Sequence, residues 1–553
     1  MKPLYLSLIF FTCVLSPSHA QVVDSTFGEP NSFVSGGYVP GMTGNDFSER
    51  EDRAYVMLFS DDGKIIMAGH TAGENDSDFA FTRMLDNGQY DQEAGPDGKV
   101  RLDLGLQHDS CLAAVRYGPD QMLMGGSGEQ AGEAGFSALL IKTDFDGQLI
   151  SSFGTEGKVF LNLPGQHEMI TRLHPLPDGK IMVAGNVFFG PSYPYPDSTS
   201  IFVGRLLENG SVDSSFGTNG FIYKNRYACP SSILGDLVFY PDGAFLLTAE
   251  TYNPYPGLQY PEGPCETSIY VSRYLPDGAI DLAFGEAGTT DVTTTAGWAK
   301  ALGIYEDGKI VVAGLTSDGL TMPNYTTVAR LLPDGSLDST FANNGVFKEF
   351  IFSPDIDPAN PVDLVVRGEE VLVGFSATEY RGYFSFGALY LTNEGQRKPN
   401  FGNNGLLTYH SIYPATRYRI KELRLSEDQQ SLYFVGSYRK LIHFDNMFIC
   451  KLDISDQTVA TDAGLYNIQA AQLYPNPLKA GEVLHIELPG LGETSGDLLL
   501  QVYDSRGSLV MHQKTDAYAL AVGLSLPVRS QGVYFVEVSN EEGRYFGKVL
   551  VLD

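Results

Sequence analysis

The amino-acid sequence predicts an all-β protein, made of a seven-bladed β-propeller with repeats of about 60 residues and a small C-terminal β-sandwich. Short strands rich in β-branched and aromatic residues alternate with Asp-Gly and Pro-Asp-Gly turns along most of the 553 residues. Such turns are typical of antiparallel hairpins. A four-strand unit recurs at a nearly constant spacing, and no helical period interrupts it. Propeller blades have this organisation.

The start of the chain predicts a signal peptide over residues 1–20. Lys2 precedes a short apolar run, and Ser18 and Ala20 place small residues three and one positions before the expected cleavage site. No later apolar stretch approaches the roughly 20 residues that a membrane-spanning helix needs. We therefore expect an exported chain without a transmembrane segment.

One copy shows the repeat clearly. From Ala299 the chain reads as an apolar strand, an Asp-Gly turn, the strand KIVVAG, a variable loop, the strand TTVARLL, a Pro-Asp-Gly turn, the phrase DSTF and the short strand GVFKEF. The second strand marks seven copies: DGKIIMAG from Asp62, PDQMLMGG from Pro119, DGKIMVAG from Asp178, DGAFLLTA from Asp242, DGKIVVAG from Asp307, EEVLVG from Glu369 and QSLYFVG from Gln430. The closing phrase places phenylalanines about 60 residues apart, at Phe153, Phe216, Phe284, Phe341 and Phe401. Seven copies predict seven blades over residues 21–462.

The two ends of the repeat region predict how the ring closes. The seventh copy, at about residues 417–455, has no closing phrase, whereas VDSTFGEPNSFVSGGYV stands alone near the N-terminus. We expect residues 23–40 to supply the last strand of that blade, with Tyr38 beside the strand from Phe448 to Leu452. Closure leaves no sheet edge unpaired. The alternative is an open array with a stray N-terminal copy.

These units resemble the delta-60 repeats of secreted bacterial proteins. The motifs that carry the resemblance are DGKIVVAG, the arginine-containing strand VARLLPDGSLD and the phrase DSTFG. They are clearest in copies three to five. The resemblance covers roughly residues 22–460 and implies a propeller-like structure without a defined activity for most members.

A different pattern follows a linker at about residues 455–470. Residues 463–553 hold short alternating strands that predict a β-sandwich. They resemble the C-terminal sorting domain of type IX secretion cargo through YPNP at Tyr474 to Pro477, VYDSRG, GVYFVEV and the terminal KVLVL. The resemblance implies the type IX machinery as a partner and a secreted or outer cell-surface location. The alternative is an accessory carbohydrate-binding sandwich.

Charge and motif content limit the possible functions. The chain has 67 acidic and 37 basic residues, for a net charge of -30, which argues against binding to nucleic acid. No familiar catalytic or metal-binding motif is visible, so we expect no cofactor. His108, His167 and His174 belong to different blade positions, and Asp144 and Asp146 fit a hairpin turn better than a calcium loop.

Two pairings are suggested by position within the repeat. Cys229 and Cys265 fall in one copy, and export permits a disulfide between them, but the sequence leaves this pairing open. An arginine and an aspartate stand equidistant from one turn in four copies and are expected to pair across it. These pairs are Arg83 with Asp91, Arg205 with Asp213, Arg273 with Asp281, and Arg330 with Asp338. In the second copy Lys142 and Ile150 replace both partners, which indicates a structural role.

Three classes of function remain: a binding or adhesion module for glycan or protein ligands, an extracellular enzyme acting on a polysaccharide or peptide, and a structural surface scaffold. Binding is favoured because the loops between second and third strands differ greatly in length and are rich in tyrosine and proline. The candidate binding residues are Tyr193, Tyr195, Tyr252, Tyr255, Tyr260, Tyr325 and Tyr380. The alternative is that these rings pack their own loops against the ring.

Overall fold

The structure is a computed structural model of the whole chain. It describes residues 24, 26–28, 42–47, 51–72, 76–106, 108–130, 135–190, 198–224, 231–252, 268–293, 297–317, 324–351, 359–378, 384–402, 404–409, 417–439, 445–455, 467–470, 472–475, 478–479, 482–487, 498–504, 509–515, 524–525, 532–539 and 543–552. The chain divides into two compact units, Met1–Asp456 and Gln457–Asp553. The division falls within the expected linker, and the two units are described separately.

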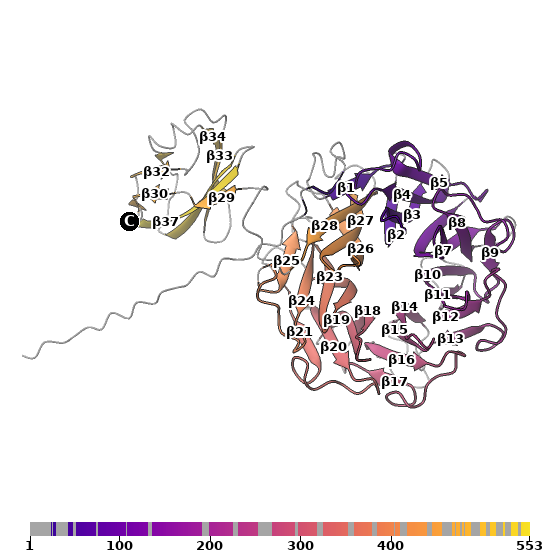
Figure 1. Cartoon of the computed structure of the whole chain (residues 1–553). Helices are drawn as coiled ribbons and strands as arrows, with labels where there is room; N and C mark the ends of the chain where they lie inside the picture. Colours follow the sequence, from indigo (N-terminus) through magenta and orange to yellow (C-terminus); the bar gives the residue numbers. More distant parts are fainter. Residues whose placement is uncertain are drawn as a thin grey trace, which may run out of the picture. The chain divides into compact units, whose positions relative to one another are not determined.

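The first unit is a ring of seven four-stranded antiparallel blades (Figure 1), which confirms the predicted all-β propeller. The first strand of each blade lies nearest the ring axis: β2 (Asp52–Phe59), β6 (Asp109–Arg116), β10 (His167–Pro175), β14 (Ser231–Phe239), β18 (Gly297–Ile304), β22 (Asn360–Arg367) and β26 (Arg417–Leu425). The second strands are β3 (Ile65–Ala72), β7 (Gln121–Glu129), β11 (Ile181–Phe189), β15 (Phe245–Tyr252), β19 (Ile310–Ser317), β23 (Glu370–Thr378) and β27 (Ser431–Arg439).

The third and fourth strands complete the blades. The third strands are β4 (Ser77–Met84), β8 (Phe136–Asp144), β12 (Ser198–Leu206), β16 (Tyr270–Tyr274), β20 (Asn324–Leu331), β24 (Phe384–Leu391) and β28 (Asp445–Asp453). The outermost strands are β5 (Lys99–Leu102), β9 (Lys158–Leu161), β13 (Phe221–Lys224), β17 (Thr289–Asp291), β21 (Val346–Glu349), β25 (Leu406–Tyr409) and β1 (Met42–Asn45). Among the described residues the one helical turn is η1 (Pro96–Gly98).

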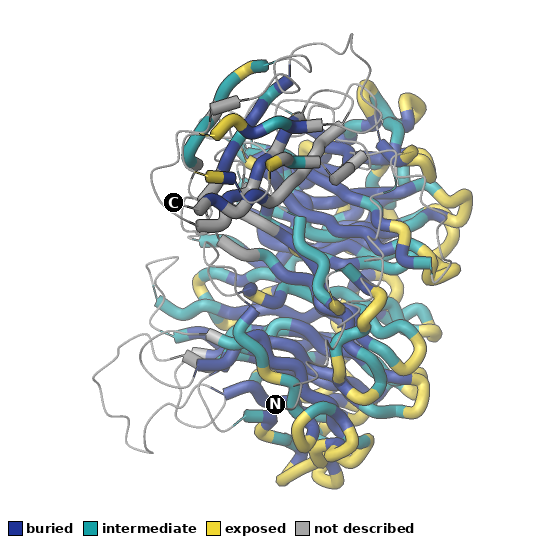
Figure 2. The backbone as a smooth tube through the Cα atoms, turned by 90° about the vertical axis from the view of Figure 1, so that its left-hand side faces the viewer, coloured by how far each residue is buried: buried dark blue, intermediate teal, exposed yellow. Residues whose placement is uncertain are grey.

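The hydrophobic core lies between the blades. All eight residues of β19 are buried, as expected for a near-continuous apolar run covered on both faces. One cluster joins Val311 and Val328 of blade five to Val373 and Leu389 of blade six. Seen from the side, buried strands fill the ring, while exposed residues gather at the hairpin turns (Figure 2). Each blade therefore depends on its neighbours for burial, as in other stacked repeat proteins.

The phenylalanine of the closing phrase explains why this phrase recurs. Phe216 and Phe341 are fully buried, and each packs against a turn glycine of the next blade, Gly278 and Gly395 respectively. A Cβ atom added at Gly278 would lie 3.0 Å from the Phe216 ring, and this glycine has a φ of +89°. A larger residue would therefore clash with the ring and strain the backbone.

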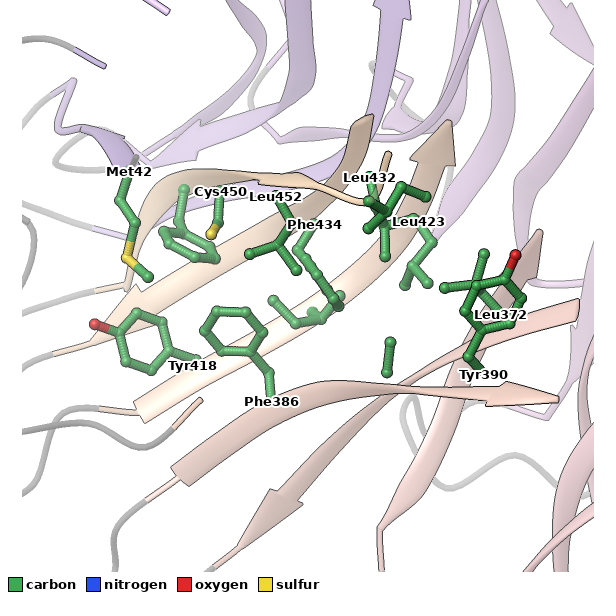
Figure 3. Close-up of a cluster of buried hydrophobic side chains, with 14 of the residues drawn as sticks. Met42, Leu372, Phe386, Tyr390, Tyr418, Leu423, Leu432, Phe434, Cys450 and Leu452 are labelled. Carbon is green, nitrogen blue, oxygen red and sulfur yellow. The ribbon is translucent and has the colours of Figure 1, made fainter. Parts of the chain in front are cut away.

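Strand β1 closes the ring, because Met42 to Asn45 pair antiparallel with Cys450 to Met447 of β28. Met42 lies beside Cys450 in the core shared by blades six and seven (Figure 3). The closing strand was expected within residues 23–40. The structure describes only Asp24 and residues 26–28 of that range, so Tyr38 lies outside the described residues. The chain between Phe27 and β1 is longer than between Phe216 and β13, so the strand lies further along the sequence than the phrase suggests.

The second unit contains two sheets. One has the order β29-β37-β36-β33-β34, with β31 also paired to β37, and the other has the order β30-β32-β35. The strands are β29 (Asn467–Ala470), β30 (Gln472–Tyr474), β31 (Leu478–Lys479), β32 (Val483–Glu487), β33 (Leu498–Asp504), β34 (Leu509–Thr515), β35 (Leu524–Ser525), β36 (Gly532–Ser539) and β37 (Gly543–Leu552). Leu484, Leu500 and Val536 are buried in a common core. This arrangement matches the predicted small β-sandwich.

Candidate functional site

The seven inner strands share a β-bulge, and the bulge distinguishes the region near the ring axis from the rest of the blade. Each inner strand shifts register against the second strand of its blade, and the shifts lie at Ala54/Val56, Cys111/Ala113, Ile170/Arg172, Leu234/Asp236, Ala299/Ala301, Pro361/Asp363 and Ile420/Glu422. A bulge bends the strand and redirects the side chains that follow it.

Three of the seven bulges are followed by an acidic residue that bonds to the next blade. Asp236 Oδ2 accepts a hydrogen bond from Leu302 N at 2.8 Å, and Asp363 Oδ2 accepts one from Leu423 N at 2.8 Å. Glu422 Oε2 accepts one from Met57 N. Asp236 and Asp363 also accept from the backbone N–H of their own following residue, both at 2.8 Å. These carboxylates therefore fasten successive inner strands to one another.

The acidic groups near the axis influence each other across the ring. Burial, together with the charges of Asp236 and Glu422, raises the pKa of Asp363 to about 8. Arg172 of blade three donates Nε to Asp236 Oδ1 at 2.7 Å. Burial tends to lower the pKa of Arg172, but the charges of Asp236, Asp363 and Glu422 raise it. Although a raised carboxyl pKa is common at catalytic sites, both oxygens of Asp363 are engaged by backbone N–H groups. A structural role accounts for this residue.

A pocket lies where the inner strands of blades five, six and seven end. It has a volume of about 410 Å³, and we call it the β18–β22–β26 pocket. Its lining is Leu302, Gly303, Ile304, Leu364, Val365, Val366, Arg424, Leu425, Ser426, Glu427 and Gln429. The pocket is open to solvent, and its lining is about equally polar and apolar.

Arg424 is the cation of this pocket. Its Nη2 donates to Met57 O at 2.8 Å and lies 3.0 Å from Glu422 Oε1. Its Nε is buried and has no hydrogen-bond partner among the described residues, although 41% of the side chain is exposed. The exposed part of this guanidinium borders the pocket and is suited to donate a charge-assisted hydrogen bond to an oxygen of a ligand.

The arginine and aspartate residues expected to pair lie within hydrogen-bonding distance. The Nε to Oδ2 distances are 2.7 Å for Arg83–Asp91, 2.8 Å for Arg205–Asp213, 2.7 Å for Arg273–Asp281 and 2.8 Å for Arg330–Asp338. Each arginine also donates Nη1 to a backbone oxygen of the next blade, such as Pro276 O for Arg205 and Asn393 O for Arg330. In blade six, Tyr390 and Lys398 occupy the two positions, with Lys398 Nζ 4.7 Å from the ring centre. These residues join neighbouring blades, and none of them lines the pocket.

The loop tyrosines are largely outside the described residues, which applies to Tyr193, Tyr195, Tyr255, Tyr260 and Tyr380. Tyr252 ends β15, where its backbone pairs with Ser231. The Tyr325 ring meets Phe350 edge to face at 6.0 Å and lies 4.5 Å from Lys348 Nζ. These contacts fasten Tyr325 to its own blade.

Other candidate groups also have local roles. Cys229 and Cys265 lie outside the described residues, whereas Cys111 and Cys450 are free and buried. His174 stacks on Phe239 at 4.1 Å, and burial lowers the pKa of His174 and of His167. Asp144 accepts hydrogen bonds from backbone N–H groups of its own turn, and Asp146 pairs with Arg83, while His108 lies next to Ser77. Within the described ranges, no group of three or more histidines, cysteines or acidic residues could hold a metal ion.

The bulge carboxylates and the pocket were not identified from the sequence. A signal was nevertheless present, because each carboxylate interrupts an apolar first strand, as in ILGDLVF, PVDLVV and IKELRL. An acidic residue in such a run indicates a specific hydrogen-bonding role.

Nowhere in the described residues does a helix reach the length and hydrophobicity that a bilayer span requires.

Comparisons with protein families agree with both parts of the chain. Residues 176–216 and 306–341 match a β-propeller domain of unknown function (DUF5122), and residues 472–552 match the secretion system C-terminal sorting domain. The chain thus combines propeller repeats with a type IX sorting domain, which marks it for export and for a secreted or cell-surface location. No curated protein matches the chain.

Solved structures with a similar fold are distant in sequence. The polysaccharide lyase Uly1 has 10% identity and a TM-score of 0.42, covering 79% of this chain and 98% of its own. A protein of unknown function from Dyadobacter fermentans has 11% identity and a TM-score of 0.39, covering 75% of this chain and 100% of its own. The propeller domain of the Trilobed protease from Pyrococcus furiosus has 10% identity and a TM-score of 0.39, covering 75% and 99%. Likeness at this level carries no argument about activity.

Proposed function

We propose that the exported propeller is a binding module for a glycan or protein ligand and that the β18–β22–β26 pocket is its binding site. The observation that carries this proposal is the combination of apolar side chains with the partly exposed guanidinium of Arg424 in the pocket lining. A volume of about 410 Å³ lies within the usual range for small-ligand sites.

The lining indicates the kind of ligand surface that fits. Ile304, Val365 and Val366 are partly exposed and offer apolar contact area, while Arg424 and Glu427 provide charged groups. A sugar ring and an extended peptide both combine an apolar face with hydrogen-bonding oxygens. In either case the exposed part of the Arg424 guanidinium would donate to a ligand oxygen.

An enzyme acting on a polysaccharide or peptide is less well supported by the same region. Glu427 is the acidic residue of the pocket lining itself. The other acidic groups nearby, Asp236, Asp363 and Glu422, each already accept a hydrogen bond from a neighbouring backbone N–H. A general acid or base must be within reach of its substrate and free to exchange a proton. The carboxyl groups of Asp236, Asp363 and Glu422 are already engaged in hydrogen bonds that join neighbouring blades.

The proposal is tested by screening residues 21–553 against glycan and peptide arrays and then measuring affinity for the strongest ligand by calorimetry. We expect Arg424→Met to weaken this affinity by about tenfold or more, because it removes a charged donor and retains the apolar stem. The matched control is Arg116→Met, which changes an inner-strand arginine of blade two, outside the pocket lining.

Arg424 also contacts Met57 O, so thermal unfolding must show that the Arg424→Met ring remains folded. A second variant, Glu427→Lys, reverses a charge of the pocket lining on an exposed turn residue and is expected to change affinity without disturbing the core. Unchanged affinity in both variants would exclude this pocket as the binding site.

A further inference from the structure

A second group of charged residues lies on the inner strands, on the other side of the bulge from the β18–β22–β26 pocket. Its centre is Lys421, the bulge residue of β26. Lys421 is exposed, and among the described residues its ammonium has one recorded contact, a cation–π approach of 5.2 Å to the Tyr55 ring of blade one. No carboxylate of the described residues forms an ion pair with it.

The neighbours of Lys421 are mainly cations from three blades. Arg53 of blade one and Arg419 of blade seven share one carboxylate, Asp445 Oδ2, at 3.3 Å and 3.5 Å. Lys300 of blade five pairs with Glu250 at 2.9 Å. Although Lys421 is exposed to solvent, the protein around it partly desolvates the ammonium, which lowers its pKa. The charges of Arg53, Arg419 and Lys300 lower this pKa further, and the charge of Asp445 acts in the opposite direction. These cations are therefore close enough to repel the ammonium.

Local carboxylates leave part of this charge uncompensated. Glu51 and Asp445 pair with Arg53 and Arg419, and Glu250 pairs with Lys300. Within the described part of the chain, Lys421 is the cation of this group without an ion pair of its own, and Asp445 attracts it from a distance. The chain as a whole carries a net charge of -30. A local excess of positive charge in such a chain is an exception, and like charges held together destabilise the fold unless an anion joins them.

The aromatic neighbours of Lys421 add no charge to this group of residues. Tyr55 stands beside His70, with ring centres 5.5 Å apart. Burial and the nearby Arg53 lower the pKa of His70 to about 4, so the imidazole is neutral at physiological pH. The guanidinium groups remain within reach of solvent, since 32% of the Arg53 side chain and 42% of the Arg419 side chain are exposed.

We propose that Lys421, with Arg53 and Arg419, forms an anion site near the ring axis that takes a compact oxyanion, either a carboxylate or a sulfate group. An oxyanion between an ammonium and two guanidinium groups makes charge-assisted hydrogen bonds, which are stronger than neutral ones. The anion would supply the negative charge that Lys421 lacks in the protein. This site is separate from the β18–β22–β26 pocket, and its test does not depend on the function proposed for that pocket.

The experiment uses residues 21–553 and four probes, sodium sulfate, sodium glucuronate, sodium chloride at matched ionic strength, and glucose. Thermal unfolding and calorimetry are expected to show saturable stabilisation by sulfate or by glucuronate, with no such response to chloride or glucose. Lys421→Ala should weaken the response by about tenfold or more, whereas Lys421→Arg should retain it. The matched control Lys309→Ala changes a turn lysine paired with Asp307 and should respond as the natural chain does.

A second readout is independent of any ligand. Because Lys421 is repelled by its neighbours, Lys421→Ala without added anion is expected to unfold at the same temperature as the natural chain or higher. Equal stabilisation by chloride, or an unchanged anion response in Lys421→Ala, would overturn the proposal. Arg424→Met should leave the anion response intact, so failure of the pocket proposal and failure of this one are distinguishable.

Discussion

Blades five and seven make the same contacts from different parts of the chain. In blade five, Asp338 N donates to Arg330 O at 2.9 Å, and Ala342 N donates to Glu394 O of the next blade at 2.8 Å. In blade seven, Asp24 N donates to Lys451 O at 3.1 Å, and Gly28 N donates to Asn87 O of blade one at 2.8 Å. In blade five, the residues that make these hydrogen bonds belong to the same continuous segment as the blade. In blade seven, they come from the N-terminal segment, whereas the rest of the blade comes from the C-terminal end of the propeller sequence.

The side-chain contacts of blades five and seven also correspond. Arg330 pairs with Asp338 at 2.8 Å and lies 4.8 Å from the Phe341 ring. Lys451 pairs with Asp24 at 2.9 Å and lies 5.7 Å from the Phe27 ring. Phe27 is buried and packs on Gly88 of blade one, as Phe341 packs on Gly395 of blade six. The closing phrase therefore keeps its role when it is separated from its blade.

The two blades differ in burial and in chain connectivity. The Arg330 and Asp338 side chains are 3% and 4% exposed, against 20% and 22% for Lys451 and Asp24. Closing a longer loop costs more conformational entropy, by about 0.6 kcal/mol for each doubling of its length. Blade seven thus makes a weaker ion pair against a larger entropic cost, so we expect it to be the first blade to open.

The largest expected effect comes from removing the N-terminal contribution to blade seven. Deleting residues 21–46 from the exported chain removes β1, Phe27 and Asp24 and leaves β28 as an unpaired edge, which favours aggregation. We expect a clear loss of thermal stability by circular dichroism and the appearance of aggregates by size exclusion. A permuted chain, in which residues 21–47 follow residue 455 through a Gly-Ser linker, should restore a stable monomer. If the deletion unfolds at the natural temperature, blade seven does not depend on this segment.

The next effect compares the two buried phenylalanines. Phe27→Ala and Phe341→Ala are each expected to lower the free energy of unfolding by about 3–5 kcal/mol, because both leave a cavity between blades. Only Phe27→Ala should accelerate amide hydrogen exchange in β1 and β28, since it releases the closing segment. Identical exchange in the two variants would show that blade seven is no easier to open than blade five.

The smallest effect concerns the ion pair of the closing blade. Burial tends to raise the pKa of Asp24, but the Thr26 hydroxyl and the Lys451 ammonium outweigh it and hold this pKa below its usual range. The carboxylate therefore stabilises the fold above the pKa of the unfolded chain, and this stability is lost as the pH falls through the lower folded pKa.

We expect Asp24→Asn to lower the free energy of unfolding by about 1 kcal/mol or less at pH 7 and by less still below about pH 4. Denaturant titrations at several pH values measure this difference. Asp338→Asn is the matched variant, and it should cost more because its pair with Arg330 is more fully buried. A larger loss in Asp24→Asn than in Asp338→Asn would contradict the contrast between the two blades.

The sequence by itself determined the repeat, the turns, the seven-bladed fold and the nature of the tail. Residues that meet across one hairpin, such as Arg330 and Asp338, are close in sequence, so turn chemistry and strand alternation place them together. The lone N-terminal phrase with Asp24 and Phe27 also indicated how the ring closes, because a motif that recurs at fixed positions implies its partners.

Only the tertiary structure decided the position of the closing strand, the roles of Asp236 and Asp363, and the location of the pocket and of Lys421. These features join blades that are far apart in the sequence, as when Arg53 of blade one and Arg419 of blade seven meet at Asp445. Hydrophobic periodicity specifies which face of a strand is buried. It does not specify which side chains a bulge turns toward the ring axis or which distant blade they meet there, because both depend on how seven separate sheets pack around one centre.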